Sequence, residues 1–179
     1  MKKIYMILAA ITLLSMSLNA QTSSVTVGNG TSTSNYLPVY GWYYDYNQQN
    51  QLIYTAADLG LTSGTQITSM TFYTSNGIHF SGGSVSVKLG TTTETDWASY
   101  NATAITGVTL TQVASLSTFS TNSNNEWTIN FSSPYIYTGD NLLVQFDCVA
   151  GTCDPSSSGT NSTQFYGNTN HNSFYSYGS

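Results

Sequence analysis

Charged side chains are scarce in this sequence. They make up 6% of the 179 residues, with three Lys or Arg and eight Asp or Glu. Lys2 and Lys3 belong to the leader described below, so the rest of the chain has one positive side chain, Lys88, against eight negative ones, a net charge of −7. Nucleic-acid binding needs several basic side chains to displace phosphate counterions, and anionic membranes attract the same kind of basic cluster. We therefore expect neither partner.

The N-terminal leader has the three parts of a secretory signal peptide. Lys2 and Lys3 precede the apolar stretch 4–18, and the small residue Ala20 follows. This pattern predicts a bacterial signal peptide over residues 1–20 that is removed on export. No later stretch is apolar enough to span a bilayer, so we expect no membrane insertion after cleavage. The expected location is secreted, extracellular or at the cell surface.

The sequence contains only two cysteines, Cys148 and Cys153, which flank the short segment VAGT. An exported protein meets an oxidising compartment, so we predict that they form a disulfide that closes a local loop. Their spacing is not Cys-x-x-Cys, and no second pair is present to complete a zinc site. Asp140, Asp147 and Asp154 could offer oxygens to calcium, but no EF-hand series accompanies them. We expect no metal and no cofactor.

Apolar and polar residues alternate with a period of two along much of the sequence. Residues 141–148 read NLLVQFDC, which places the even-numbered side chains on one face and the odd-numbered ones on the other. Such a pattern is typical of half-buried strands in antiparallel sheets. Further strands are expected at 84–89, 127–131, 25–27, 37–46, 52–55, 67–73, 108–116 and 164–166, with one helical turn at 55–60.

Many short strands separated by Gly and Asn turns predict an all-β fold. The length of residues 21–179 fits a single domain. We expect a two-sheet antiparallel β-sandwich, most simply a jelly-roll-like one. The tail from Asp154 onward is rich in Ser, Asn, Gly and Tyr and loosely patterned, so the sequence leaves open whether the domain has or lacks its last strand.

Catalytic motifs are sparse. The sequence has no G-x-S-x-G elbow and no H-E-x-x-H pair. Glu94 and Asp96 have the i, i+2 spacing that places two carboxylates on one side of a strand, as a retaining glycosidase requires. The third acid of the E-x-D-x-x-E signature of laminarinase-type glycosidases is replaced by Ser99, and the flanking residues indicate a loop. We do not expect an enzyme, and glycoside hydrolysis is the weaker alternative.

The stretch GWYYDYNQQNQ at 41–51 is the candidate binding segment. In an unbroken strand, Trp42, Tyr44 and Tyr46 share one face and present flat rings with polar tips. Asp45 and Asn47, with the amides of residues 48–51, could supply hydrogen bonds that orient a ligand. A neutral, hydroxyl-rich ligand such as a glycan suits this composition. The alternative is a packing strand, because Tyr and Trp favour strands in general and Pro38 or Gly41 could break the register.

Three segments together resemble a known module: residues 25–60, the pair ITSMTFYTS and VSVKLGTT, and residues 127–146. They are similar to the N-terminal jelly-roll-like β-sandwich of secreted and surface proteins from bacteria that use the type IX secretion system, comparable to cleaved-adhesin modules. The resemblance implies an extracellular adhesion module and supplies no catalytic residues. Because those proteins continue into fibronectin-like repeats and a sorting domain, the resemblance implies that this chain is either a fragment of a longer protein or a small stand-alone relative.

Our leading hypothesis is a non-catalytic extracellular binding or adhesion module, with carbohydrate as the favoured ligand. Its partner is expected to be a glycan or another cell-surface component, and its oligomeric state is left open. The alternative is a purely structural spacer or scaffold domain of a larger surface protein.

Overall fold

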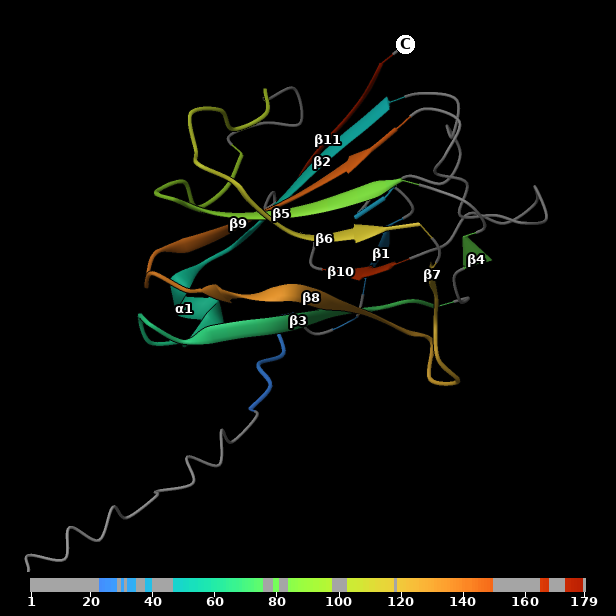
Figure 1. Cartoon of the computed structure of the whole chain (residues 1–179), viewed down its shortest axis with the longest axis horizontal. Helices are drawn as coiled ribbons and strands as arrows, with labels where there is room; N and C mark the ends of the chain where they lie inside the picture. The colour runs from blue at the N-terminus through green and yellow to red at the C-terminus, as the bar shows by residue number, and fades with distance from the viewer. Residues whose placement is uncertain are drawn as a thin grey trace, which may run out of the picture.

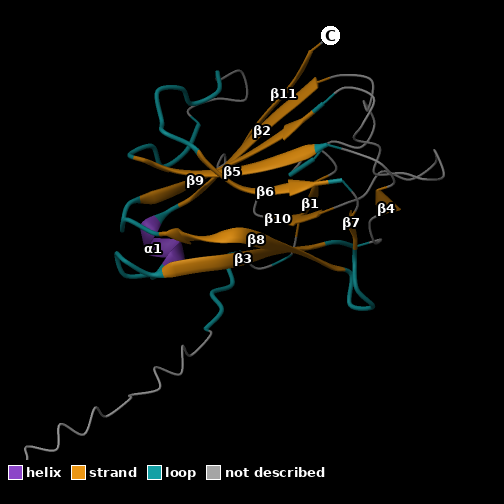
Figure 2. Cartoon of the chain, viewed as in Figure 1, coloured by secondary structure: helices purple, strands orange, loops and turns teal. Residues whose placement is uncertain are grey.

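The computed structural model describes residues 23–28, 30, 32–34, 38–39, 47–75, 79–80, 84–97, 103–117, 119–149, 165–167 and 173–178. Nearly all regular structure in these residues is β-strand, and the one helix is the single turn α1 (Ala56–Leu59) (Figure 2). Two antiparallel sheets lie over one another with the core between them (Figure 1). The predicted all-β antiparallel sandwich is therefore confirmed.

The larger sheet has five strands in the order β11-β2-β9-β5-β6. Neighbouring strands are antiparallel throughout, and β9 is hydrogen-bonded along its length to β2 on one side and β5 on the other. β9 is thus the central strand, although it comes late in the chain. The bounds are β2 (Asn47–Tyr54), β5 (Val85–Thr92), β6 (Thr111–Leu116), β9 (Asn141–Cys148) and β11 (Ser173–Gly178).

The second layer is built on the pair β3 (Gln66–Tyr73) and β8 (Glu126–Ile136). Two small ribbons complete the described strands. One pairs β1 (Ser32–Ser34) with β10 (Phe165–Gly167), and the other pairs β4 (His79–Phe80) with β7 (Phe119–Ser120). A jelly roll needs eight strands in two such sheets, so that finer prediction stays a prediction.

An irregularity in β8 closes one side of the sandwich. The pairing of Ile67 with Tyr135 is followed by the pairing of Ser69 with Asn130, so β8 contains extra residues at this point. In that insertion the Ser132 hydroxyl donates a hydrogen bond of 3.0 Å to the Val113 carbonyl of β6. Bulges bend a strand and redirect its side chains. Here the bend brings β8 against the edge strand of the larger sheet.

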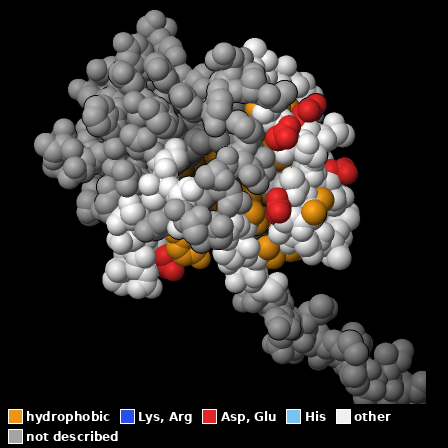
Figure 3. All heavy atoms as spheres, turned by 180° about the vertical axis from the view of Figure 1, so that it is seen from behind, with side chains coloured by type: hydrophobic (Ala, Val, Ile, Leu, Met, Phe, Trp, Pro, Cys, Tyr) orange, Lys and Arg blue, Asp and Glu red, His pale blue; other side chains and the backbone are white. Residues whose placement is uncertain are grey.

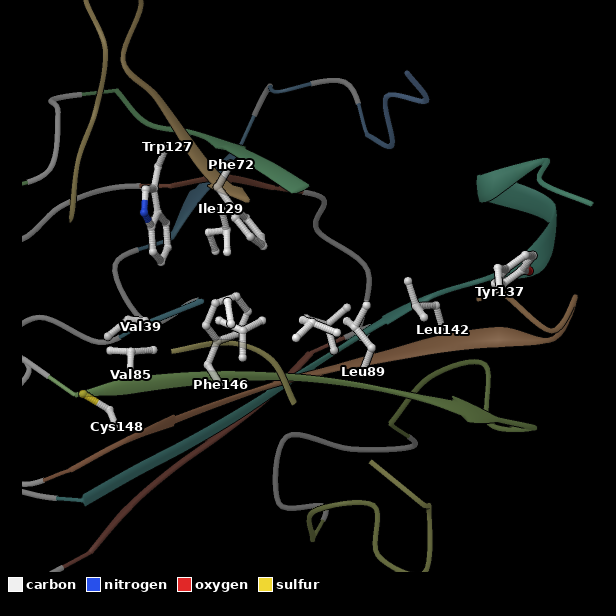
Figure 4. Close-up of a cluster of buried hydrophobic side chains, with 14 of the residues drawn as sticks. Val39, Phe72, Val85, Leu89, Trp127, Ile129, Tyr137, Leu142, Phe146 and Cys148 are labelled. Atoms are coloured by element: carbon white, nitrogen blue, oxygen red, sulfur yellow. The ribbon is translucent and has the colours of Figure 1, made fainter. Parts of the chain in front are cut away.

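The two sheets meet through a cluster of three aromatic rings. Trp127 and Phe72 are cross-strand partners in the β3–β8 pair, and Phe146 rises from β9 of the facing sheet (Figure 4). Their ring centroids lie 5.6 to 6.1 Å apart in tilted and edge-on arrangements. Trp127 and Phe146 are almost fully buried. Aromatic pairs in this geometry contribute beyond their buried area, so this cluster fixes how the layers are stacked.

The helical turn α1 is defined by its caps. The Thr55 hydroxyl accepts a hydrogen bond of 3.1 Å from the Asp58 backbone N–H, as an N-cap residue does. Gly60 ends the turn in the left-handed conformation at φ 59°. The Asn141 side chain accepts from the Ala56 N–H at 2.9 Å and donates to the Glu94 carbonyl at 2.8 Å. It therefore joins the start of β9 to both α1 and the loop that follows β5.

Several predicted elements agree with the structure, and others were wrong. Residues 141–148 form a strand over the predicted span, and the turn at 55–60 contains α1. Residues 25–27 have no strand structure, Pro38 and Val39 form a bend, and the strand predicted at 108–116 begins only at Thr111. β11 lies in the tail that we expected to be loosely patterned. The half-buried character predicted for 141–148 was also wrong, because Leu143 and Gln145 on the second face are buried as well.

We expect Phe146→Ala to lower the free energy of unfolding by roughly 3–5 kcal/mol, because the truncation opens a cavity between the sheets. Urea unfolding of the purified protein measures the change. Tyr73→Ala, which removes an aromatic ring 43% exposed on β3, is the matched control and should change stability far less. Equal losses for the two variants would contradict the assignment of the core.

We expect the protein to lose stability at alkaline pH through Tyr54. Burial raises the pKa of Tyr54 from its ordinary 10.0 to about 12. The unfolded chain loses this proton first, so the contribution is fully present below pH 10 and is lost as the pH rises to about 12. Tyr54→Phe should remove a pH-dependent change of roughly 2 kcal/mol in the free energy of unfolding between these two pH values. Urea unfolding at several pH values checks this, and an unchanged slope would contradict it; Tyr73→Phe is the control.

Candidate ligand-binding face

The outer face of the five-stranded sheet is divided into a covered part and an open part. Residues 103–110, here called the strap, run over the end of the sheet where Ile53, Leu143 and Gly90 lie side by side in register. A small apolar cluster forms beneath and around the strap. Its members are Ile53, Trp97, Leu143, Ile105, Val108 and Leu110. The strap is the reason that Leu143 on the outer face of β9 is buried.

Gly90 lets the strap approach the sheet closely. A Cβ at this position would lie 2.6 Å from the Val108 Cγ1, 2.8 Å from the Thr109 carbonyl oxygen and 2.9 Å from the Leu110 Cδ2. Such distances are too short for any side chain. Residue 90 is therefore a glycine because the strap's backbone lies directly on β5 here, as expected for glycine in a strand interior.

Gln51 of β2 fastens the strap through its side-chain amide. The Gln51 Nε2 donates to the Ile105 carbonyl at 3.0 Å, and the Gln51 Oε1 accepts from the Ile105 N–H at 2.8 Å. The same Nε2 donates to the Oε1 of Gln145 at 2.8 Å. Gln51 is fully buried, so these bonds satisfy an amide that would otherwise be costly to bury. The Gln51 amide thus bonds to both backbone groups of Ile105, as a residue of a neighbouring strand would.

Beyond the strap, the same face is polar and open to solvent. Lys88 of β5 forms an ion pair with Asp147 of β9, with 2.7 Å between the Nζ and the Oδ2. The Asp147 carboxylate also accepts from the Gln145 amide at 2.9 and 3.0 Å and from the Gln49 amide at 3.4 Å. We call this part of the sheet the polar face. It comprises Asn47, Gln49, Ser86, Lys88, Gln112, Ser115 and Asp147.

The ion pair at the centre of the polar face is half-exposed. The side chains of Lys88 and Asp147 retain 32% and 27% of their exposure. Lys88 is the one basic side chain of the chain beyond the leader, so the pair leaves this face without net charge. Elsewhere the surface carries scattered carboxylates among neutral groups, and the described part of the face seen in Figure 3 shows no Lys or Arg. The polar face is therefore the one described place where a cationic donor and an anionic acceptor stand together.

The structure describes one of the five predicted binding residues. Trp42, Tyr44, Asp45 and Tyr46 lie outside the described residues, and their predicted contacts stay a prediction. Asn47 is the first residue of β2 and is exposed. By alternation along the strand it shares a face with Gln49, so it extends the polar face at its outer end.

The amides that follow Asn47 have separate tasks. Gln48 and Asn50 face the core and are buried, and the Asn50 Nδ2 donates to the Pro38 carbonyl at 2.8 Å. Gln51 holds the strap. The expectation that this whole run supplies ligand contacts is therefore wrong for these buried residues. Asn47 and Gln49 instead lie on the polar face, and strand alternation together with burial accounts for the division.

The alternative catalytic pair does not lie on a strand. Glu94 and Asp96 are exposed and belong to the loop that follows β5. The Glu94 backbone N–H donates to the Thr92 hydroxyl at 3.1 Å. Because the segment is not extended strand, the i, i+2 spacing does not place the two carboxylates on one side of a sheet. The spacing argument for a glycoside hydrolase therefore does not apply to these two residues.

The described residues include only part of the predicted disulfide and only part of the possible calcium site. Cys148 is buried at the end of β9, and no described cysteine is free. Its expected partner Cys153 lies outside the described residues, so the disulfide stays a prediction. Asp154 lies outside them too, while the Asp147 carboxylate is engaged by Lys88. Within the described part of the chain, no group of three or more His, Cys, Asp and Glu could hold a metal ion.

Comparison with known proteins gives no relative for this chain. No family model matches it, and no curated protein or solved structure is significantly similar. The resemblance to type IX-exported adhesin modules therefore stays a prediction. In the described residues, no helix has the length and apolarity needed to cross a membrane.

We expect Gln51→Ala to release the strap. The substitution removes the side-chain partner of the Ile105 N–H, the Ile105 carbonyl and the Gln145 Oε1, at a cost of roughly 2–4 kcal/mol in the free energy of unfolding. Hydrogen exchange of the Ile105 amide should become much faster than that of the β9 amides. Gln112→Ala, which removes an exposed glutamine from β6, is the control. Unchanged protection of the Ile105 amide would show that Gln51 does not hold the strap.

Proposed function

We propose that the protein is a non-catalytic extracellular module that binds an uncharged glycan on the polar face. The supporting observation is the ion pair of Lys88 and Asp147, which is half-exposed and supported by Gln145 and Gln49. It is the single feature of the described surface in which opposite charges are held in fixed positions next to polar amides.

The chemistry of the ion pair suits adjacent hydroxyl groups. A lysine ammonium has three donors, of which the ion pair uses one, so two remain for a ligand. Both Asp147 oxygens already accept from Lys88, Gln145 and Gln49, so the carboxylate holds the ammonium in place. Two neighbouring hydroxyls of a sugar ring can accept the two remaining hydrogen bonds of the ammonium. Hydrogen bonds to charged groups are stronger than neutral ones. Exposed Asn47 and half-buried Gln49 lie along the same face, which makes the surroundings of the ion pair polar.

The electrostatics support an uncharged ligand. An anionic glycan would meet a chain of net charge −7 beyond the leader (one positive and eight negative side chains), and its one cation is already neutralised by Asp147. The aromatic residues Trp42, Tyr44 and Tyr46 immediately precede β2 in the sequence. We propose that they stack against the ligand and that Asp45 adds a hydrogen bond, which would extend the site beyond Asn47.

A glycan-array screen of the exported protein tests this function, followed by titration calorimetry on the glycans that bind. Lys88→Met keeps the length of the side chain and removes the ammonium, so we expect binding to weaken tenfold or more. Asp147→Asn should weaken it similarly. Asp96→Asn changes an exposed loop carboxylate away from the polar face and should leave the affinity unchanged.

Thermal melts of the same variants separate recognition from structural support. Binding lost in a Lys88→Met variant that melts like the wild type supports the glycan module. No binding to any array glycan would overturn the proposal. If Trp42→Ala also melted far below the wild type, the aromatic segment would be a packing element, and the scaffold alternative would take precedence.

A further inference from the structure

A groove lies at the end of the sandwich, on the other side of the strap from the polar face. It is a groove of about 480 Å³, within the usual range for ligand sites. Its walls are the end of β5 and the loop after it, the strap, and Tyr135 of β8. We call it the end groove. Its lining residues are Thr91, Thr92, Thr93, Glu94, residues 105–109 and Tyr135.

The end groove is separate from the polar face. Both lie along β5, which carries Ser86 and Lys88 on the polar face, then Gly90 beneath the strap, then Thr91 and Thr92 in the groove. Because the strap sits directly on Gly90, it divides the two regions. A ligand in the end groove therefore does not touch the ion pair of the polar face.

Hydroxyl groups dominate the lining. Thr91, Thr93, Thr106, Thr109 and Tyr135 contribute them, and no Lys, Arg or His lines the groove. The Thr91 hydroxyl lies 2.7 Å from that of Thr138 and 3.4 Å from that of Tyr135, so these groups are arranged as a connected set. Hydroxyls both donate and accept. Such a lining matches a ligand that is itself rich in hydroxyls.

The walls of the end groove are held in place before any ligand binds. The strap is pinned through Gln51 at Ile105 and packs on Gly90. The opposite wall is fixed by Asn141, which donates to the Glu94 carbonyl at 2.8 Å. A preformed site avoids the entropic cost of ordering loops on binding. Glu94 itself keeps an exposed carboxylate and is the one charged side chain in the lining.

We infer that the end groove is a second binding site, specific for an uncharged polyhydroxyl ligand of one or two sugar units. The Thr91 and Tyr135 hydroxyls and the Glu94 carboxylate provide its hydrogen bonds, while Ile105 and Val108 of the strap supply apolar contact. The carboxylate with no basic neighbour in the lining disfavours acidic sugars. The site shares its ligand class with the proposed function but none of its residues.

Nuclear magnetic resonance titration of the exported, ¹⁵N-labelled protein with maltose, cellobiose and lactose tests the inference. We expect saturable shifts of the Thr106, Gly107 and Thr109 amide signals with at least one of these sugars. Thr91→Val keeps the shape of the side chain and removes its hydroxyl, so it should weaken this binding about tenfold. Glu94→Gln is the second groove variant and should weaken it too.

Controls distinguish the end groove from the polar face. Thr71→Val removes a hydroxyl from a similar exposed pair, that of Thr71 with Thr128 at 2.9 Å on the β3–β8 layer, and should have no effect. Lys88→Met should leave the groove shifts intact. Saturable shifts confined to the Gln49 and Asp147 amides would overturn the groove and support the proposed function. Saturable shifts confined to the groove would support the groove and leave the polar face to the glycan array, and saturable shifts at neither site would overturn the groove.

Discussion

The pairing of the Gln51 side chain with the Ile105 backbone is the interaction on which the outer half of this molecule depends. It holds the strap over Ile53 and Leu143, so that this part of β9 is buried on its outer face as well as on its core face. A buried amide that makes all of these bonds stabilises one arrangement of the chain, whereas a partly satisfied one would destabilise it. By fixing the strap, Gln51 also sets the boundary between the polar face and the end groove.

The sequence predicted the sandwich because alternation and turn residues are local signals. The span of β9 and the inward faces of β5 and β8 follow from that period alone. The second buried face of β9 could not be predicted in the same way. Leu143 is covered by residues some forty positions earlier in the chain, and only the tertiary arrangement brings them together. β11 was missed for a related reason, since its composition gives a weak signal and its pairing with β2 spans most of the chain.

The candidate site was only partly predictable. A run of Asn and Gln after a cluster of aromatics indicates ligand contact, yet strand alternation sends Gln48 and Asn50 into the core and leaves Asn47 and Gln49 outside. No pattern in the sequence connects Lys88 with Asp147, which are 59 positions apart and become neighbours because β5 and β9 pair. The scarcity of basic residues was the one signal in the sequence. Lys88 is the single Lys or Arg after residue 3, and the structure places it beside a carboxylate on the open face of the sheet.

A low charge content shapes how such a protein can recognise anything. With few ion pairs available, orientation must come from amides and hydroxyls, whose hydrogen bonds are weak singly and specific only when the groups are held in place. The structure meets this condition by attaching polar side chains to paired strands and by bonding the strap and the Glu94 loop to side chains from the sheet, Gln51 and Asn141. Because both candidate regions share the strap as a wall, a change that loosens the strap alters each of them, whereas a change confined to Lys88 or Thr91 alters one.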